Sequence, residues 1–281
     1  MSQYQKKVDF SIKLLRSIPQ DGEIELSYSG GKDSDVILQL AKEAGIPFRA
    51  IYKSTTIDPP GTIAHCKENG VEIMKPKMTF FQLVEKKGWP TRRARFCCEV
   101  LKEYKVLDRA IQGIRRSEST ARAKRYKEPE LCRVYSAKEK VRVYLPILDW
   151  TNDDVVRFIE ERSIKCHDLY YDKPILWDGF HVERRLGCIG CPMQSDNGKS
   201  DFVQYPTMLK HWIRAEKKYI ENHPNSNAKR KFLNEYGIAY HDLFNKSYEE
   251  FLTQTTGGLF PETAIDPKKF LEDYFKIDLT I

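Results

Sequence analysis

Residues 29–34 read Ser-Gly-Gly-Lys-Asp-Ser and stand between a short β-prone run and a run with helical apolar periodicity. In α/β proteins this strand–turn–helix position is where oxyanions are held. Glycines let backbone N–H groups approach a ligand closely, and the following helix N-terminus favours negative charge. The lysine adds a point charge, and the serines add hydroxyls. The spacing is not that of a Walker A loop. The segment therefore predicts a phosphate or pyrophosphate site of another type.

Two pairs of cysteines form the second chemical signal, Cys97-Cys98 and Cys188-x-x-Cys191. Adjacent residues on a helix diverge by about 100°, so Cys97 and Cys98 are poorly placed to grip one tetrahedral ion. They suit two corners of an iron–sulfur cubane, and the C-x-x-C pair suits the other two. Four thiolates meet the requirement of a [4Fe–4S] cluster. Zinc and purely structural thiols stay open as alternatives.

The other cysteines show no pairing pattern. Cys66, Cys132 and Cys166 are expected to be small buried hydrophobic residues. Lys102 follows Cys98 by four residues, so a continuous helix would place both on one face. A cation there would offset the charge of a cluster or contact a bound phosphate.

The pattern along the chain indicates the elements that must position these residues. Short β-prone runs alternate with helical periodicity in the first part of the sequence. Strands are expected at 23–28, 48–52, 71–74, 110–114 and within 132–145, and helices at 3–18, 34–44, 61–69, 79–87, 95–109, from 151, and at 201–222 and 226–236. This alternation predicts an α/β, Rossmann-like fold with a parallel sheet and helices on both faces. Ligands of such sheets bind beyond the carboxyl ends of the strands.

The β-α rhythm fades after about residue 165. We expect a nucleotide-binding α/β domain over residues 1–165, and a helical, cysteine-bearing C-terminal region over residues 166–281. The 281 residues carry a net charge of +7, and no run is apolar enough to span a bilayer. The N-terminus shows no apolar signal-peptide core, so the sequence predicts a cytoplasmic protein whose basic charge suits an anionic partner.

The order of these motifs resembles the phosphoadenosine phosphosulfate (PAPS) reductase family, in the PP-loop ATP pyrophosphatase superfamily of HUP-type folds. Residues 29–34 match the PP-loop, and residues 55–62 resemble the family's loop after the second strand. Residues 113–122 resemble its G-x-R…S…R segment, and residues 146–155 match its P-I-x-x-W-T-x-x-D-V stretch. The cysteine pattern resembles that of cluster-bearing adenylyl-sulfate (APS) reductases.

The resemblance implies ATP, Mg²⁺ and a [4Fe–4S] cluster as cofactors. The residues expected to bind the nucleotide are Ser27, Ser29, Gly30, Gly31, Lys32, Asp33, Ser34, Thr55, Asp58, Gly113, Arg115, Ser119 and Arg122. The expected catalytic residues are Lys32, Asp33, Arg115 and Arg116. Mg²⁺ is expected on Asp33 or Asp58, and the cluster on Cys97, Cys98, Cys188 and Cys191.

Two departures separate the chain from sulfonucleotide reductases. Those reductases carry a C-terminal cysteine that attacks the sulfate sulfur, whereas no cysteine follows Cys191 here. The PP-loop is also intact, which suits cleavage of ATP between its α- and β-phosphates. We therefore expect an ATP pyrophosphatase that activates sulfur transfer, similar to tRNA thiolases and DNA phosphorothioation proteins and supplied by a cysteine desulfurase-like donor. Two alternatives remain, an APS/PAPS reductase that uses an external thiol and a non-catalytic nucleotide- or redox-sensing module.

The acceptor of the sulfur stays open between DNA, tRNA and a sulfonucleotide. Basic and aromatic residues would suit a nucleic-acid track, and ordinary solvated surface is the equal alternative. The residues concerned are Arg92, Arg93, Arg95, the loop 115–127, Lys229-Arg230-Lys231, Tyr126, Trp212 and Tyr219.

Overall fold

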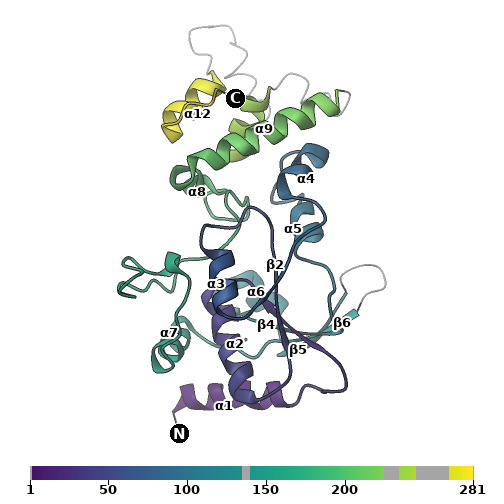
Figure 1. Cartoon of the computed structure of the whole chain (residues 1–281), viewed down its shortest axis with the longest axis vertical. Helices are drawn as coiled ribbons and strands as arrows, with labels where there is room; N and C mark the ends of the chain where they lie inside the picture. The colour runs from purple at the N-terminus through teal and green to yellow at the C-terminus, as the bar shows by residue number, and fades with distance from the viewer. Residues whose placement is uncertain (1, 135–139, 225–233, 245–265, 281) are drawn as a thin grey trace. The chain divides into compact units, whose positions relative to one another are not determined.

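A six-stranded sheet organises the first part of the chain in the computed structural model, which describes residues 2–134, 140–224, 234–244 and 266–280 (Figure 1). The strand order is β3-β2-β1-β4-β6-β5. The strands are β1 (Ile24–Tyr28), β2 (Arg49–Lys53), β3 (Glu72–Met74), β4 (Arg109–Gln112), β5 (Glu130–Val134) and β6 (Lys140–Tyr144). All neighbouring pairs are parallel except β5–β6, which is antiparallel. The expected α/β fold with a mainly parallel sheet, flanked by helices, is confirmed.

Helices connect and follow the strands, and none in the described part of the chain is long and apolar enough to cross a membrane. Those that follow or precede the sheet strands are α1 (Gln3–Arg16), α2 (Lys32–Ala44), α3 (Thr62–Glu68), α4 (Phe80–Lys87), α5 (Phe96–Leu101), the 3₁₀ helix η1 (Arg116–Glu118), α6 (Thr120–Arg125) and α7 (Asn152–Glu161). The later ones are the 3₁₀ helix η2 (Asp168–Tyr170), α8 (Lys199–Gln204), α9 (Pro206–Asn222), α10 (Glu235–Phe244) and α12 (Pro267–Phe275).

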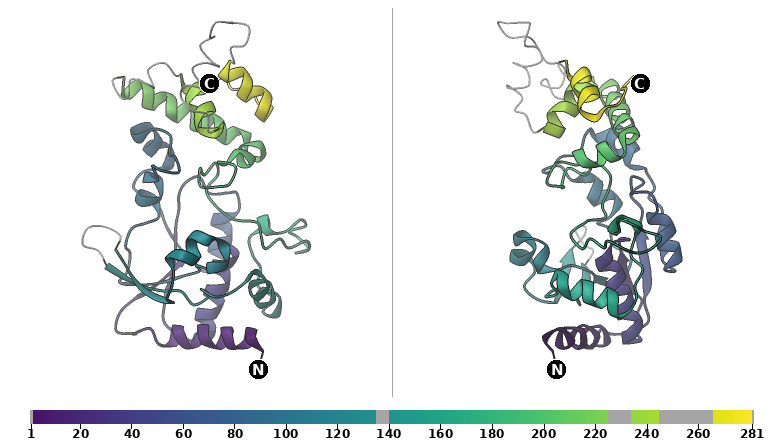
Figure 2. Two further views of the ribbon diagram at one scale, coloured as in Figure 1. Left: turned by 180° about the vertical axis from the view of Figure 1, so that it is seen from behind. Right: turned by 90° about the vertical axis from the view of Figure 1, so that its left-hand side faces the viewer.

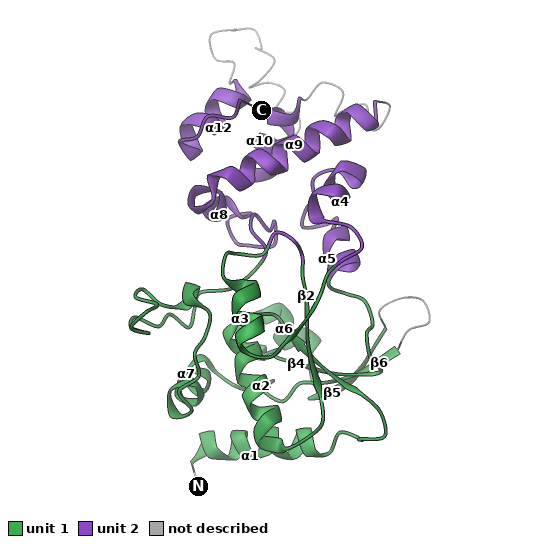
Figure 3. Ribbon diagram, viewed as in Figure 1, with its two compact units in different colours: residues 1–54, 58–75, 102–187 green, residues 55–57, 76–101, 188–281 purple. Residues whose placement is uncertain are grey.

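The chain divides into two compact units that interleave along the sequence (Figure 3). Unit 1 comprises residues 1–54, 58–75 and 102–187, and unit 2 comprises residues 55–57, 76–101 and 188–281. A domain boundary near residue 165 stays a prediction. Both cysteine pairs belong to unit 2, although about ninety residues of sequence lie between them.

Unit 1 is built around α2, which packs on β1 and β4 with α1 and α7 beside it (Figure 1 and Figure 2). Its apolar side chains alternate with a helical period and are buried against the sheet. The predicted start of α7 is confirmed as a capping box, because the Thr151 and Asp154 side chains each accept a hydrogen bond from the other's backbone N–H. The capping box defines the start of α7, which packs against α2, the helix that follows the phosphate loop.

Unit 2 has its own aromatic core. The Trp212 ring on α9 is fully buried, and its centroid lies 4.6 Å from that of Phe80, 4.6 Å from that of Trp89 and 5.7 Å from that of Phe202. These rings come from α4, the segment before α5, α8 and α9, so one cluster holds together segments far apart in sequence. The expectation that Trp212 offers a stacking surface to nucleic acid is therefore wrong.

Two other predictions are wrong in part, and a third concerns residues that the structure does not describe. The helix expected at 95–109 ends at Leu101, so Lys102 follows the helix instead of sharing a face with Cys98. Cys132 is exposed because it lies on the edge strand β5, whereas Cys66 and Cys166 are buried as expected. Most of the helix expected at 226–236, and Lys229-Arg230-Lys231 within it, lie outside the described residues.

Candidate functional site

The predicted phosphate loop joins β1 to α2. Gly30 has a φ of +78°, and a Cβ there would lie 3.0 Å from Leu186 Cδ2 and 3.1 Å from Thr62 Cγ2. Gly31 is the N-cap of α2 in an extended conformation, and no side chain caps the helix. Within the first turn, Ser34 N donates a 2.8 Å hydrogen bond to Gly31 O and Lys32 N bonds the Tyr170 hydroxyl, so the turn offers a ligand mainly the positive end of the helix dipole.

A buried ion cluster lies at the start of α2. Lys32 is 3% exposed, and its Nζ lies 3.3 Å from Asp33 Oδ2. Asp33 Oδ1 accepts a 2.7 Å hydrogen bond from Nε of Arg115, which is 1% exposed and also donates to Ser117 Oγ and Asn152 Oδ1. Burial lowers the pKa of Lys32. Arg115 therefore fixes the Asp33 carboxylate. An anionic ligand beside Lys32 would favour its charged form and so raise the lysine pKa again.

A cavity of about 220 Å³ opens beside this loop. Lys32, Arg122 and Arg185 line it together with Glu118, which pairs with Arg122 and lies 3.8 Å from Arg185 Nη2. Burial and the positive charge of Arg185 lower the pKa of Arg122. Three cations line the cavity against two carboxylates, Glu118 and Asp33, and Asp33 is already paired with Arg115, so the lining keeps a positive charge that favours an anion.

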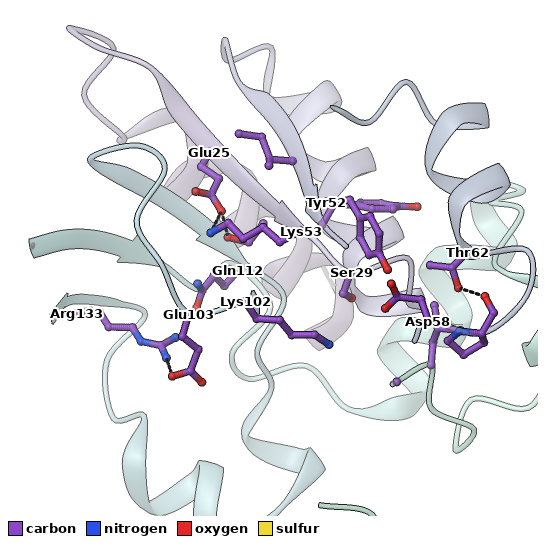
Figure 4. A pocket seen from close by; sticks show the side chains of 16 residues that line it. Glu25, Ser29, Tyr52, Lys53, Asp58, Thr62, Lys102, Glu103, Gln112 and Arg133 are labelled. Atoms are coloured by element: carbon purple, nitrogen blue, oxygen red, sulfur yellow. Dashed lines mark hydrogen bonds and ion pairs between the residues drawn. The ribbon is translucent and has the colours of Figure 1, made fainter. Parts of the chain in front are cut away.

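A second cavity, of about 230 Å³, lies at the carboxyl ends of β1 and β2 (Figure 4). It shares Ser27 and Ser29 with the first cavity. An ion pair between Glu25 Oε1 and Lys53 Nζ, 3.2 Å apart, lies in its wall, and Lys102 extends into it in Figure 4. The shared residues suit an elongated ligand whose anionic end lies at the loop and whose other end lies over the strand ends.

Most expected nucleotide-binding residues of unit 1 line these cavities. Ser27, Ser29 and Asp58 line the second cavity, and Asp58 Oδ2 accepts a 3.3 Å hydrogen bond from Ser54 Oγ. The expected residues that line the first cavity are Ser27, Ser29, Gly31, Lys32, Asp33, Ser34, Gly113 and Arg122. The structure thus brings the loop 29–34 and the segment around Gly113 to one place.

Other expected residues have structural partners. Ser119 Oγ accepts a hydrogen bond from Arg122 N and caps α6. The Arg116 guanidinium pairs with Asp149 and donates to the carbonyl oxygens of Tyr126 and Lys127. These bonds tie the loop after β4 in place, so a direct contact of Arg116 or Ser119 with a ligand stays a prediction.

Four thiols lie close together in unit 2. A hydrogen bond with Cys98, burial and the negative charges of the Cys98, Cys188 and Cys191 thiolates all raise the pKa of Cys97. Arg95 Nη2 lies 3.6 Å from Cys98 Sγ, and Cys188 Sγ lies 3.4 Å from the hydroxyl of Thr55. Thr55, expected near the nucleotide, is thus a neighbour of this thiol group within unit 2.

Four cysteine side chains are a ligand set that both a [4Fe–4S] cluster and a zinc ion use. Among the described residues, no group of three or more His, Cys, Asp and Glu side chains is arranged to hold one metal ion. The residue chemistry fits a [4Fe–4S] cluster, because a cationic inorganic core would offset the mutual repulsion of four thiolates.

Several residues near the loop were missed by sequence reasoning. Tyr170 covers Gly31, where a Cβ would lie 3.1 Å from its hydroxyl, and its ring lies 5.3 Å from Lys32 Nζ. Asp35 is buried and accepts hydrogen bonds from Tyr28 and His65. Asp35 follows the recognised hexapeptide by one residue, and its charge at an expected buried helix position was the available signal. No comparable signal pointed to Tyr170.

Fold and loop geometry together define an α/β protein with a mainly parallel sheet and a glycine-containing loop between β1 and α2, of the type that holds anions. A family model described as the phosphoadenosine phosphosulfate reductase domain matches residues 23–194, and the chain belongs to this family.

Similar proteins include both enzymes and uncharacterised proteins. An uncharacterised protein of Methanocaldococcus jannaschii is 31% identical over 214 residues, which cover 70% of this chain and 48% of that protein. Sulfate adenylyltransferase subunit 2 of Akkermansia muciniphila is 26% identical over 213 residues, covering 62% of this chain and 69% of that protein. The chain thus spans about half the length of the first of these relatives.

Two solved structures show distant likeness. PAPS reductase from Candida auris, in a phosphate complex, aligns with a TM-score of 0.42 and 16% identity over 60% of this chain and 91% of that one. The NH3-dependent NAD synthetase from Campylobacter jejuni aligns with a TM-score of 0.39 and 14% identity over 58% of this chain and 75% of that one.

Proposed function

We propose that this protein cleaves ATP to AMP and pyrophosphate and uses the cleavage to activate an acceptor for sulfur transfer. The observation that carries the proposal is the loop at residues 29–34, where the N-terminus of α2, the buried Lys32 and a cation-lined cavity lie together. In the described part of unit 1 this cavity shares Ser27 and Ser29 with a second cavity of about 230 Å³ at the strand ends, where we place the nucleoside.

The residues around the loop have distinct roles in this reaction. The first-turn N–H groups and Lys32 bind the β- and γ-phosphates, and Arg122 and Arg185 attract the departing pyrophosphate. Arg115 holds the Asp33 carboxylate, and Asp33 or Asp58 carries Mg²⁺, which prefers carboxylate and phosphate oxygens. Because most of these groups are already fixed in place, they stabilise the charge that develops on the leaving group without reorganisation.

The proposed reaction has three steps. An oxygen of the acceptor attacks the α-phosphorus, the bond to the β-phosphate breaks, and pyrophosphate leaves. A persulfide on a donor protein of the cysteine desulfurase type then displaces AMP, which carries the acceptor oxygen away and leaves the acceptor joined to the donor by an S–S bond. A second thiol cleaves that bond, so the sulfur stays on the acceptor and the donor leaves as a disulfide. We propose a nucleic acid, DNA or tRNA, as the acceptor, which suits the net charge of +7.

We further propose that Cys97, Cys98, Cys188 and Cys191 hold a [4Fe–4S] cluster. Their proximity within unit 2 supports this proposal. When bound, the cluster would supply a site that positions or delivers sulfur. Iron and sulfide analysis of protein purified without oxygen tests it, and colourless, zinc-loaded protein would contradict it.

Sulfate is a second candidate acceptor, because several relatives at 26–28% identity are named sulfate adenylyltransferase subunit 2. Attack of a sulfate oxygen on the α-phosphorus would release pyrophosphate by the same loop chemistry. The two candidates share the ATP cleavage and differ in what takes the adenylyl group.

The deciding experiment measures pyrophosphate release by protein purified without oxygen, with sulfate, tRNA or DNA added in separate reactions. Removal of one preorganised charge-stabilising donor lowers such rates by about 10²–10³-fold, so Lys32→Ala should abolish most of the release. Lys42→Ala is the matched control, since Lys42 is exposed in the last turn of the same helix. Release that is equal in both variants would refute the proposed role of the loop. Sulfite formation from APS or PAPS without ATP would instead indicate a sulfonucleotide reductase.

A further inference from the structure

One guanidinium joins the two cysteine-bearing segments of unit 2. Arg92 Nε donates a 2.9 Å hydrogen bond to the carbonyl of Pro192, directly after Cys191. Arg92 Nη2 donates to the carbonyls of Gln194, at 2.5 Å, and Ser195, at 3.3 Å. Three acceptors within four residues surround this planar donor, which presents several N–H groups in fixed directions. These three bonds engage the Arg92 guanidinium within the protein, so they compete with the contact to nucleic acid that the sequence suggested for it.

The C-x-x-C loop is shaped by further contacts of its own. Cys191 N donates to Cys188 O at 3.3 Å, and Gln194 N donates to Cys191 O at 3.1 Å. On the other side, Asp201 Oδ2 accepts a 2.8 Å bond from Gly190 N and a 2.7 Å bond from Gln194 Nε2. The loop therefore has two consecutive turns whose backbone is held by side chains from outside it.

Close packing adds a steric constraint to the loop. Gly190 has a φ of +75°, and a Cβ there would lie 2.3 Å from the Phe202 ring. Phe202 packs on Trp212, which also contacts Trp89. Trp89 and Arg92 are three residues apart, so the backbone that carries Arg92 rests on the same aromatic core as the loop that Arg92 binds.

The turn that presents Arg92 is itself ordered by hydrogen bonds. Thr91 N donates to Ala94 O at 3.3 Å, and Ala94 N donates to Thr91 Oγ1 at 3.1 Å. The helix α5, with Cys97 and Cys98, begins at Phe96. Arg92 thus lies on a short rigid connection between the aromatic core and the first cysteine pair.

We infer that Arg92 is a positioning residue that fixes the C-x-x-C loop beside Cys97 and Cys98 before any inorganic group binds. The inference rests on the proposed function in that these four thiols are the proposed cluster ligands. The positioning role of Arg92 applies to the metal-free protein as well. The loop keeps its shape through the Arg92 fork and Asp201, so assembly of a cluster has less loop entropy to overcome.

Amide hydrogen exchange of the metal-free full chain tests this inference without relying on a cluster. Each bond from a charged donor is worth about tenfold in a local opening equilibrium, so Arg92→Met should speed exchange of the amides of Cys191 and Gln194 at least tenfold. Arg93→Met is the matched control, because it removes the same charge from the next residue, which is also exposed. Exchange in Arg92→Met equal to that in the control would overturn the inference.

Arg92→Lys separates the fork from the charge. A lysine keeps the positive charge but has no planar fork to bind three carbonyls. We expect Arg92→Lys to exchange nearly as fast as Arg92→Met, and exchange at the wild-type rate would overturn the role of the fork. In reconstituted protein, loss of visible absorption in air should be about tenfold faster for Arg92→Met than for Arg93→Met.

The two proposals fail in different ways. If the wild-type chain takes up no iron, the cluster proposal fails, and the exchange experiment still decides the role of Arg92. If the wild-type chain and both Arg92 variants hold iron with equal persistence in air and exchange equally, the positioning role fails and the cluster proposal stands.

Discussion

Gly113→Ala should damage the phosphate loop from a neighbouring strand. A Cβ at Gly113 would lie 2.9 Å from the carbonyl oxygen of Asp33 and 3.1 Å from its carbonyl carbon. Both are backbone atoms in the first turn of α2, so rotation of a side chain cannot relieve the contact. Overpacking of this kind costs about 1–3 kcal/mol. The first turn must move by several tenths of an ångström, away from the position in which its N–H groups converge.

The expected loss of pyrophosphate affinity follows from those N–H groups. A hydrogen bond to a charged group contributes about 1.5–3 kcal/mol, so weakening one or two of them lowers affinity by about 10- to 100-fold. Titration calorimetry with pyrophosphate and Mg²⁺ measures this change, and thermal unfolding measures the change in stability. Gly22→Ala is the control, since its Cβ would meet only the flexible end of Arg109, at 3.2 Å. Wild-type affinity in Gly113→Ala, with Gly22→Ala unchanged, would refute the need for this close approach.

Three further predictions concern separate residues. Arg115→Lys keeps the charge but loses the fork that holds Asp33, so the free energy of unfolding should fall by about 3 kcal/mol; an unchanged urea midpoint would contradict this. Burial and a neighbouring histidine lower the pKa of His167 from 6.5 to about 4, so below pH 6.5 the unfolded state binds a proton that the folded state does not. The resulting loss in the free energy of unfolding is absent above pH 6.5 and approaches about 3 kcal/mol near pH 4. His167→Gln should therefore make the urea midpoint fall less steeply on acidification than it does in the wild type, and parallel profiles of the two proteins would count against this. Cys191→Ser should lower bound iron per chain, whereas Cys132→Ser, at the exposed edge strand, should leave it unchanged; equal iron contents would remove Cys191 from the proposed ligands.

Local patterns predicted the loop and its helix well. Glycines before a helical apolar period have few alternative structures, and the bounds of β1 and α2 follow the expected ranges within two residues. The expected helix at 95–109 failed because only six residues, Phe96–Leu101, are helical. Helical periodicity in a sequence does not show where the neighbours that a helix packs against end. The chain leaves unit 2 after Leu101, and Lys102 belongs to unit 1.

Surface roles were less predictable than elements. For Trp212 and Arg92 the sequence left a nucleic-acid track and ordinary solvated surface as equal alternatives, yet Trp212 is fully buried and Arg92 binds three carbonyls of a loop one hundred residues later. Side-chain type alone does not say whether an aromatic or a cation has a partner within the protein, because those partners are distant in sequence.

The sequence by itself determined the phosphate-loop chemistry and the presence of two cysteine pairs, since both depend on residues within a few positions of each other. Only the tertiary structure decided which segments share a unit: residues 76–101 pack with residues 188–224 through the Trp212 core, and the buried Arg115 reaches Asp33 across 82 residues. Such pairings depend on complementary shape, burial and charge between distant segments. These are properties of the packed chain, and no local pattern encodes them.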